Sequence, residues 1–81
     1  DADGLAEFLA RAKDARVTLL LREIGPSSTR VSVRTDGVDA TGIASPFRGG
    51  GHRSRAGCTV DAPLADALPR VLQEAERALE A

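Results

Sequence analysis

The sequence predicts a small α+β domain in which a mixed sheet of about three strands is flanked by helices, in the order α-β-β-α-β-α. Three observations support this prediction. Apolar residues alternate in two stretches of the first half, both ends of the chain have helical spacing, and a glycine-rich stretch precedes the last expected strand. The chain has 81 residues, of which 42% are hydrophobic. That length supports one small core, so we expect a single domain over residues 1–81.

The first half is predicted to contain one helix and two strands. Residues 3–14 are expected to form an amphipathic helix, because their larger apolar side chains fall on one helical face. Residues 15–25 and 28–37 alternate apolar and polar side chains, as half-buried strands do. The short "GPSS" segment between them suits an antiparallel hairpin.

The second half is predicted to alternate helix, strand and helix. Asp39 is placed to cap a short helix, which Pro46 should end. Residues 56–62 are predicted to form the third strand. The last helix is expected to have its N-cap near Asp66, with Pro69 in its first turn. Its apolar face is expected to comprise Leu64, Leu68, Val71, Leu72, Ala75 and Leu79.

The net charge of −1 conceals a basic zone. Residues 28–60 carry five arginines against two aspartates, a balance of +3, and the rest of the chain sums to −4. No acidic residue lies between Ala40 and Val60. A local basic zone in an otherwise acidic domain indicates an anionic ligand held at one place, not a broad surface that coats nucleic acid.

Other classes of site find little support in the sequence. One histidine, one cysteine and carboxylates on amphipathic helices make no recognisable metal-ligand set, so no metal or cofactor is expected on this chain. The single cysteine, Cys58, is expected to be a small core residue and fits a reducing compartment. No apolar run reaches the roughly 18 residues of a membrane span, so we expect a cytoplasmic protein with no membrane partner. The absence of methionine suggests a fragment of a longer protein.

The stretch "PFRGGGHRSRAGC", residues 46–58, holds the strongest functional pattern. Its three glycines, Gly49, Gly50 and Gly51, can adopt a turn whose N–H groups point into one concavity and bind phosphate or carboxylate oxygens. His52 adds a donor beside such an anion, and Arg34 at a strand end offers a planar guanidinium. Two other interpretations stay open: the glycines form only a tight connection, and the histidine bonds a backbone carbonyl. Arg30, Arg53 and Arg55 are more often solvated charges than ligands.

Three segments in order, "VSVRTDG", "VDATGIASPF" and "GGGHRSRAGCTV", resemble the C-terminal domain of Asp-His-His (DHH) family phosphoesterases. The resemblance covers roughly residues 16–80. It is strongest to bacterial oligoribonucleases that also hydrolyse 3′-phosphoadenosine 5′-phosphate or cyclic dinucleotides. The C-terminal domain of alanyl-tRNA synthetase is a more distant relative. Two positions depart from the family pattern: Arg48 stands where the first of four glycines is usual, and Arg55 stands where an alanine is usual.

The resemblance implies a division of labour within a longer hydrolase. An N-terminal Asp-His-His domain, absent from this chain, would hold two manganese ions and cut the bond, so the 81-residue chain alone is expected to be inactive. This domain would close over a nucleotide or short oligonucleotide through Arg34, the three glycines and His52, with Arg48, Arg53 and Arg55 as auxiliary cations. A homodimer formed through the parent protein is compatible with this. The principal alternative is a nucleic-acid-binding module appended to another enzyme, as in alanyl-tRNA synthetase. A third possibility is a structural domain whose ligand site has decayed.

Overall fold

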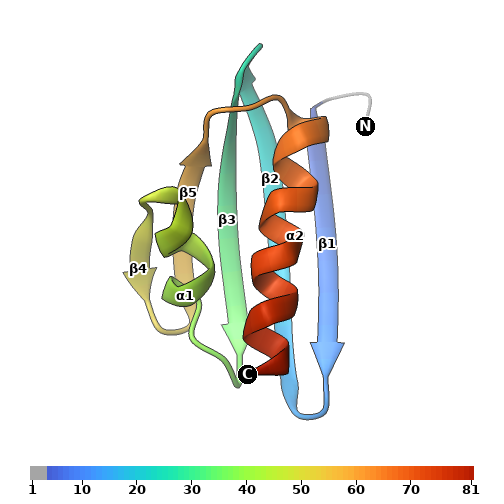
Figure 1. The fold of residues 1–81 in the computed structure, drawn as a ribbon, viewed down its shortest axis with the longest axis vertical. Coiled ribbons are helices and arrows are strands. Elements are labelled where there is room, and N and C mark those ends of the chain that lie inside the picture. The colour runs from blue at the N-terminus through green and yellow to red at the C-terminus, as the bar shows by residue number, and fades with distance from the viewer. Residues whose placement is uncertain (1–3) are drawn as a thin grey trace.

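The computed structural model describes residues 4–81 and contains a five-stranded sheet with two helices (Figure 1). The spatial order of the strands is β1-β2-β3-β5-β4, and every neighbouring pair is antiparallel. Along the chain the elements are β1 (Leu5–Ala12), β2 (Ala15–Gly25), β3 (Ser28–Asp36), α1 (Thr41–Ala44), the 3₁₀ turn η1 (Ser45–Phe47), β4 (Gly50–His52), β5 (Arg55–Val60) and α2 (Leu64–Glu80).

The predicted α+β class is confirmed, with corrections to its details. The sheet has five strands where about three were expected, and it is antiparallel throughout where a mixed sheet was expected. The element order is β-β-β-α-β-β-α. The strands expected at 15–25 and 28–37, their hairpin, the short helix and the strand near 56–62 are all present.

The helix expected at residues 3–14 was wrong, because the described part of this segment forms β1. Its full length pairs with β2, from Leu5 opposite Arg22 to Ala12 opposite Ala15. Lys13 begins the two-residue turn with a φ of 54°. Alanine, leucine and glutamate favour a helix locally, but pairing satisfies the backbone groups along the edge of β2 that would otherwise be unpaired. Tertiary pairing therefore overrides local propensity here.

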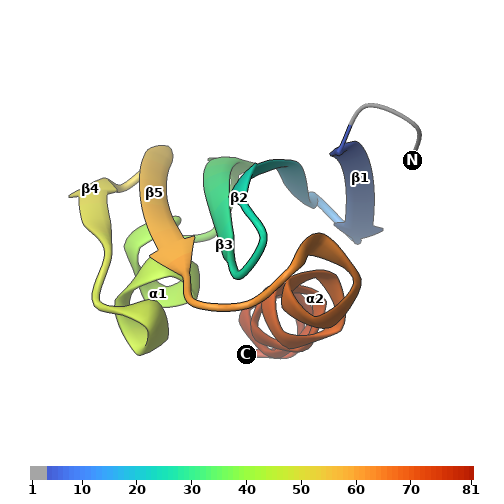
Figure 2. The ribbon, with the colours of Figure 1, turned by 90° about the horizontal axis from the view of Figure 1, so that it is seen from above.

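Both helices cover the same face of the sheet, and the opposite face is open (Figure 2). The core lies between the helices and the sheet. Alternate residues of β2, β3 and β5 point into it, and α1 and α2 close it from the other side. Its largest fully buried side chains are Leu19, Leu21, Ile43, Val17, Val31, Val33, Val71, Thr29 and Cys58.

Helix α2 begins earlier than the expected N-cap near Asp66. Its N-cap is Pro63, so Pro69 lies inside the helix and not in the first turn. The early start allows Leu64, which is buried, to pack against the core ahead of Val71 and Ala75. The rest of the expected apolar face is partly buried against the same core, at Leu68, Leu72 and Leu79.

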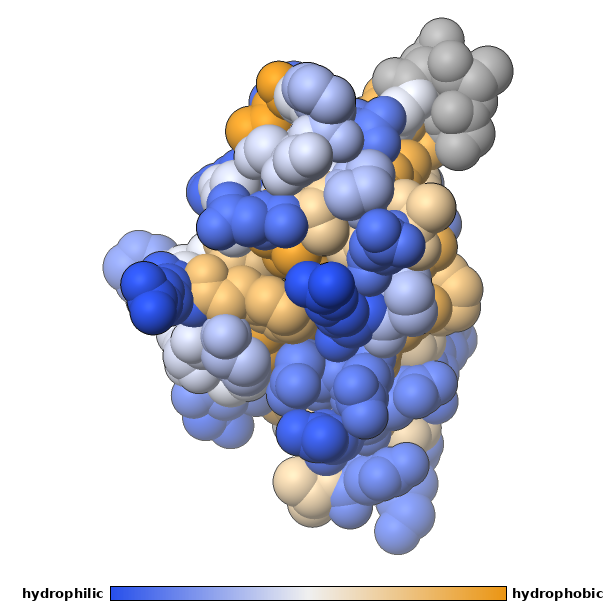
Figure 3. Space-filling view, turned by 45° about the horizontal axis from the view of Figure 1, so that its top comes forward, coloured by the Kyte–Doolittle hydropathy of each residue, from blue (hydrophilic) through white to orange (hydrophobic). Residues whose placement is uncertain are grey.

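The surface on the helix side is mostly hydrophilic, and its hydrophobic side chains show only in small groups (Figure 3). Larger exposed hydrophobic residues gather on β1 and β2, including Leu9 at 51% and Leu20 at 44% exposure. Within residues 4–81, no helix has both the length and the apolar character that crossing a bilayer requires. On the open sheet face, paired strands hold outward side chains where a ligand can reach them.

Candidate functional site

Three cationic or titratable side chains lie in one row across the open face. Arg34 on β3 is directly opposite Arg55 on β5, and Arg55 is directly opposite His52 on β4. Residues opposite one another in a sheet project to the same side. Val33 and Ala56, one position away, are buried on the helix side, so the row of Arg34, Arg55 and His52 faces outward. We call these three residues the basic row.

The basic row has no acidic partner in the described part of the chain. The ion pairs within 4.0 Å among residues 4–81 join Arg16 to Asp36, Arg53 to Asp39, and Arg77 to Glu74. Like charges directly opposite one another destabilise a sheet. The pairing of Arg34 with Arg55 therefore costs stability when no anion is present. An oxyanion between them would remove that cost and accept planar bidentate hydrogen bonds.

The three glycines do not form the expected turn. Gly50 and Gly51 belong to β4, the strand at one edge of the sheet. A Cβ at Gly49 would overlap the carbonyl oxygen of Gly57, and a Cβ at Gly51, where φ is +151°, would lie 2.5 Å from the carbonyl oxygen of Arg55. Close packing of the backbone explains these two glycines.

Gly50 is different, because nothing in the fold requires a glycine at this position. A Cβ built there meets nothing within 4 Å, and its φ lies outside the positive range that excludes side chains. Gly50 pairs with Gly57 of β5, so two residues without side chains lie next to each other on the open face, beside the basic row. The Arg30 guanidinium lies over Gly57, so a ligand can approach bare main chain closely at Gly50.

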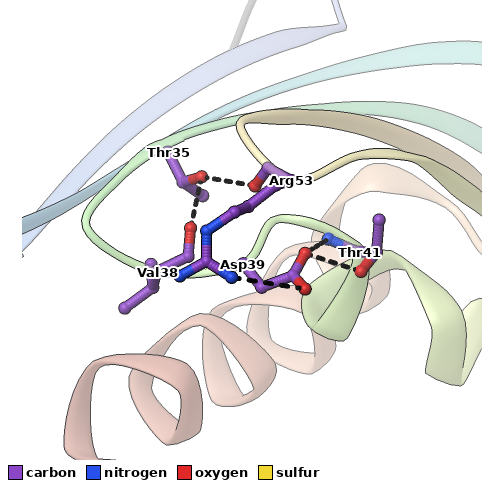
Figure 4. Close-up of polar contacts among 5 residues, drawn as sticks. All are labelled: Thr35, Val38, Asp39, Thr41 and Arg53. Atoms are coloured by element: carbon purple, nitrogen blue, oxygen red, sulfur yellow. Dashed lines mark hydrogen bonds and ion pairs between the residues drawn. The ribbon is translucent and has the colours of Figure 1, made fainter.

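The turn between β4 and β5 is tied to the end of β3 by Thr35 (Figure 4). The Oγ1 of Thr35 lies 2.7 Å from the carbonyl oxygen of Val38 and 3.1 Å from that of Arg53, and it can donate to one of them at a time. The backbone N–H of Thr35 donates to the carbonyl oxygen of Ser54 at 3.0 Å. Thr35 therefore holds Arg34 and the turn that carries His52 and Arg55 in fixed relative positions.

Asp39 secures the same turn from the helix side (Figure 4). Its Oδ1 accepts the backbone N–H of Thr41 at 2.9 Å and the hydroxyl of Thr41 at 2.6 Å. The N-cap residue of α1 is Ala40, one residue after the predicted Asp39, so this carboxylate contacts the start of the helix from the preceding position. Its Oδ2 lies 4.0 Å from the guanidinium of Arg53. These hydrogen bonds from Thr41, with a smaller effect of Arg53, lower the pKa of Asp39 below its ordinary value of 3.8.

Two of the suggested auxiliary arginines lie apart from the basic row. Arg53 points back to Asp39, and Arg48 lines a separate depression with Phe47, Asp61 and Arg70. Arg48 has a φ of 63°, which is in the left-handed region where a glycine carries no strain. Arg55 is the auxiliary arginine that the fold brings beside Arg34 and His52.

A groove of about 710 Å³ extends from the basic row across the open face. Arg34, Arg55 and Ser54 line one side, and Leu9 and Thr18 lie on the strands beyond Arg34 in the same register row. Glu7, Arg16, Thr35 and Asp36 complete its lining. Its volume falls within the range of roughly 300–1,000 Å³ that is usual for small-molecule sites. The groove thus joins the arginines of the basic row to a partly apolar floor.

Residues 4–81 contain no cluster of three or more histidine, cysteine or acidic side chains able to hold a metal ion. Cys58 is 2% exposed, as expected for a core residue, and burial raises the pKa of its thiol. The buried thiol lies on the opposite side of β5 from the basic row and takes no part in it.

The sequence matches the DHHA1 domain over residues 1–81. The chain belongs to the DHHA1 domain family. This domain is associated with DHH phosphoesterases, which are hydrolases, so the resemblance noted in the sequence is confirmed at the level of the family. In this DHHA1 domain the arginine of the strand motif and the histidine of the glycine motif lie in the same register row, joined by Arg55.

Sequence reasoning missed two features of this DHHA1 domain. It grouped Arg53 and Arg55 as equal auxiliaries, although the β4–β5 turn sends them to opposite sides. It assigned no role to Thr35, which fixes the turn. Alternation from Val31 and Val33 already placed Arg34 outward, but the register of β5 against β3 was needed to separate Arg55 from Arg53.

Proposed function

We propose that this DHHA1 domain binds a phosphate group of the substrate of a metal-dependent phosphoesterase, and that the basic row is the binding site. The substrate class that we propose is short oligonucleotides, 3′-phosphoadenosine 5′-phosphate or cyclic dinucleotides. The observation that carries the proposal is the outward row of Arg34, Arg55 and His52, drawn from three strands with no carboxylate partner among the described residues.

The groove beside the basic row supports a nucleotide over a simple anion. A phosphate at Arg34 and Arg55 would leave the attached nucleoside over Leu9 and Thr18, where the floor is partly apolar. Arginine guanidinium groups match the planar geometry of phosphate oxygens, and His52 supplies a further donor at the end of the row.

In this proposal the bond is broken by another domain of the parent protein. The described residues offer no ligand set for manganese, so the Asp-His-His domain would hold it and supply the Lewis acid chemistry. The part played by this chain is to bind and orient the phosphate. The substrate and the catalytic domain are then its two partners.

The second candidate is a module that binds tRNA for a different enzyme, like the C-terminal domain of alanyl-tRNA synthetase. The number of arginines on the open face favours it, because phosphate contacts of any nucleic acid would use them. The two candidates differ in the ligand they need, since the first requires measurable binding of a single nucleotide and the second requires a folded RNA.

Ligand-observed ³¹P NMR with adenosine 5′-monophosphate tests the proposed function. We expect the wild-type chain to broaden and shift the phosphorus resonance. Arg34→Gln should weaken the affinity roughly tenfold or more, because it removes a charge-assisted contact. Arg77→Gln is the matched control, since Arg77 lies on α2 and pairs with Glu74. Equal effects of the two substitutions, or binding of tRNA without any binding of the mononucleotide, would contradict the proposal.

A further inference from the structure

Beyond the two arginines of the basic row, a further arginine reaches toward the paired glycines Gly50 and Gly57 from the side opposite that row. Arg30 lies on the open face of β3, and its Nη1 donates to the Oγ1 of Thr59 on β5 at 3.3 Å. Its Nη2 lies 2.6 Å from the position that a Cβ of Gly57 would occupy. The guanidinium therefore lies over Gly57 on β5, next to its pairing partner Gly50 on β4.

The charges around Arg30 give it no reason to take this position for stability. Arg22 is directly opposite it on β2, so its nearest charged cross-strand neighbour is another arginine. Among residues 4–81, the acidic residues on the open face are Glu7, which is two strands away from β3, and Asp36, which pairs with Arg16. One hydrogen bond to Thr59 leaves most of the five guanidinium N–H donors available.

The strand register places Arg30 and the two glycines at different positions along the sheet from the basic row. Gly57 and Gly50 lie opposite Ser32, two residues along β3 from Arg34, a separation of about 7 Å at the usual rise of a strand. A ligand group over Gly50 would meet bare backbone below it, with the guanidinium of Arg30 beside it over Gly57. The basic row would at the same time hold a different group of the same ligand.

We propose that Arg30, lying over Gly57 beside the bare backbone of Gly50, forms a second phosphate subsite that binds the next phosphate of the same oligonucleotide. This inference rests on the proposed function, because the basic row must hold the first phosphate. It makes the domain selective for ligands with two phosphates on successive nucleotides. Gly50 is then a glycine because the ligand occupies the space where its side chain would stand.

The test uses the 81-residue chain with two ligands, adenosine 5′-monophosphate and the dinucleotide pApA, whose terminal and internal phosphorus atoms give separate ³¹P resonances. We expect Arg30→Gln to weaken pApA binding about tenfold, as for one charge-assisted hydrogen bond. In the Arg30→Gln variant, one of the two phosphorus resonances of pApA should no longer shift when the protein is added. The salt dependence of pApA binding should become shallower by about 0.7 in the slope of log K against log salt. Affinity for the mononucleotide should change less than twofold.

Two further variants make the test specific. Arg22→Gln removes one positive charge from the residue directly opposite Arg30 on β2, away from the glycines. This variant should bind both ligands within about twofold of the wild-type affinity. Gly57→Ala keeps the charge of Arg30 but displaces its guanidinium, and it should reproduce the selective loss of pApA.

The outcomes distinguish the two proposals. Failure of the wild-type chain to bind the mononucleotide would overturn the proposed function. Normal mononucleotide binding, with pApA affinity unaffected by Arg30→Gln or lowered equally by Arg22→Gln, would overturn the second subsite alone. Selective loss in Arg30→Gln and Gly57→Ala supports it.

Discussion

The Oε2 of Glu23 on β2 accepts the backbone N–H of Leu64, the first residue of α2, at 2.9 Å. The N-cap residue of this helix is Pro63, whose side chain has no oxygen to accept such a bond. A carboxylate from the sheet therefore caps the helix, at the end where negative charge is favourable. This contact joins the helix layer directly to the strand that lies beside β3 and the basic row.

Loss of this cap should destabilise the domain measurably. We expect Glu23→Ala to lower the free energy of unfolding by about 1 kcal/mol, which is typical of a lost N-cap. Glu23→Gln keeps an oxygen acceptor and should lose less. Urea denaturation gives the comparison, with Glu76→Ala as the control on the exposed surface of α2. Equal losses in Glu23→Ala and Glu76→Ala would show that the contact does not cap the helix.

The Asp39 carboxylate should titrate below the ordinary pKa of 3.8, because hydrogen bonds from Thr41 favour its charged form. Since the folded-state pKa is depressed, the stabilisation is fully present above the ordinary value and is lost as pH falls through the folded-state pKa. Carboxyl ¹³C NMR of the folded protein measures the midpoint directly. Thr41→Val removes the hydroxyl donor and should raise it. A midpoint at or above 3.8 in the wild type would contradict the arrangement in Figure 4.

Gly49 and Gly50 should respond in opposite ways to alanine. A Cβ at position 49 collides with the backbone of β5, so Gly49→Ala should cost roughly 1–3 kcal/mol, as overpacking does. Gly50→Ala meets open space, and it should leave stability unchanged or raise it by up to about 1 kcal/mol through the unfolded state. Thermal and urea unfolding of both variants check this. Similar losses at the two positions would contradict the assignment of Gly50 to the ligand.

If the proposed function holds, His52 should matter more for the activity of the full-length enzyme than for folding. It is exposed on the edge strand β4, so His52→Ala should change the melting temperature little. Removal of one charge-assisted bond to phosphate, worth roughly 1.5–3 kcal/mol, corresponds to about a ten- to hundredfold fall in kcat/KM. Both quantities are measured on one preparation. A clear fall in melting temperature with near-normal activity per folded molecule would instead assign His52 a structural role.

Side-chain periodicity was enough to predict the strands with many apolar residues and the last helix. Val31 and Val33 alternate with polar residues, and Val71 and Ala75 recur at helical spacing. The same method failed at the two edge strands. In β1, Leu5 and Leu9 occupy the exposed face and mimic a helical pattern, and in β4 two glycines carry no side chains to show alternation.

The candidate site was only partly predictable for a related reason. The strand alternation placed Arg34 outward, and the glycine-histidine pattern drew attention to His52. Their proximity depends on the register of β5 against β3 and β4, which the local sequence does not specify. The same register distinguishes Arg55 from Arg53, and it places Arg30 beside the glycines.

A protein-observed NMR titration tests whether the basic row binds phosphate. Amide resonances of the ¹⁵N-labelled chain are followed while adenosine 5′-monophosphate is added at low and at physiological salt. We predict saturable shifts at Arg34 and across residues 52–55, weaker at the higher salt because exposed charges are screened. Shifts confined to α2, or shifts absent from Arg34 and residues 52–55 at both salt concentrations, would contradict phosphate binding by the basic row.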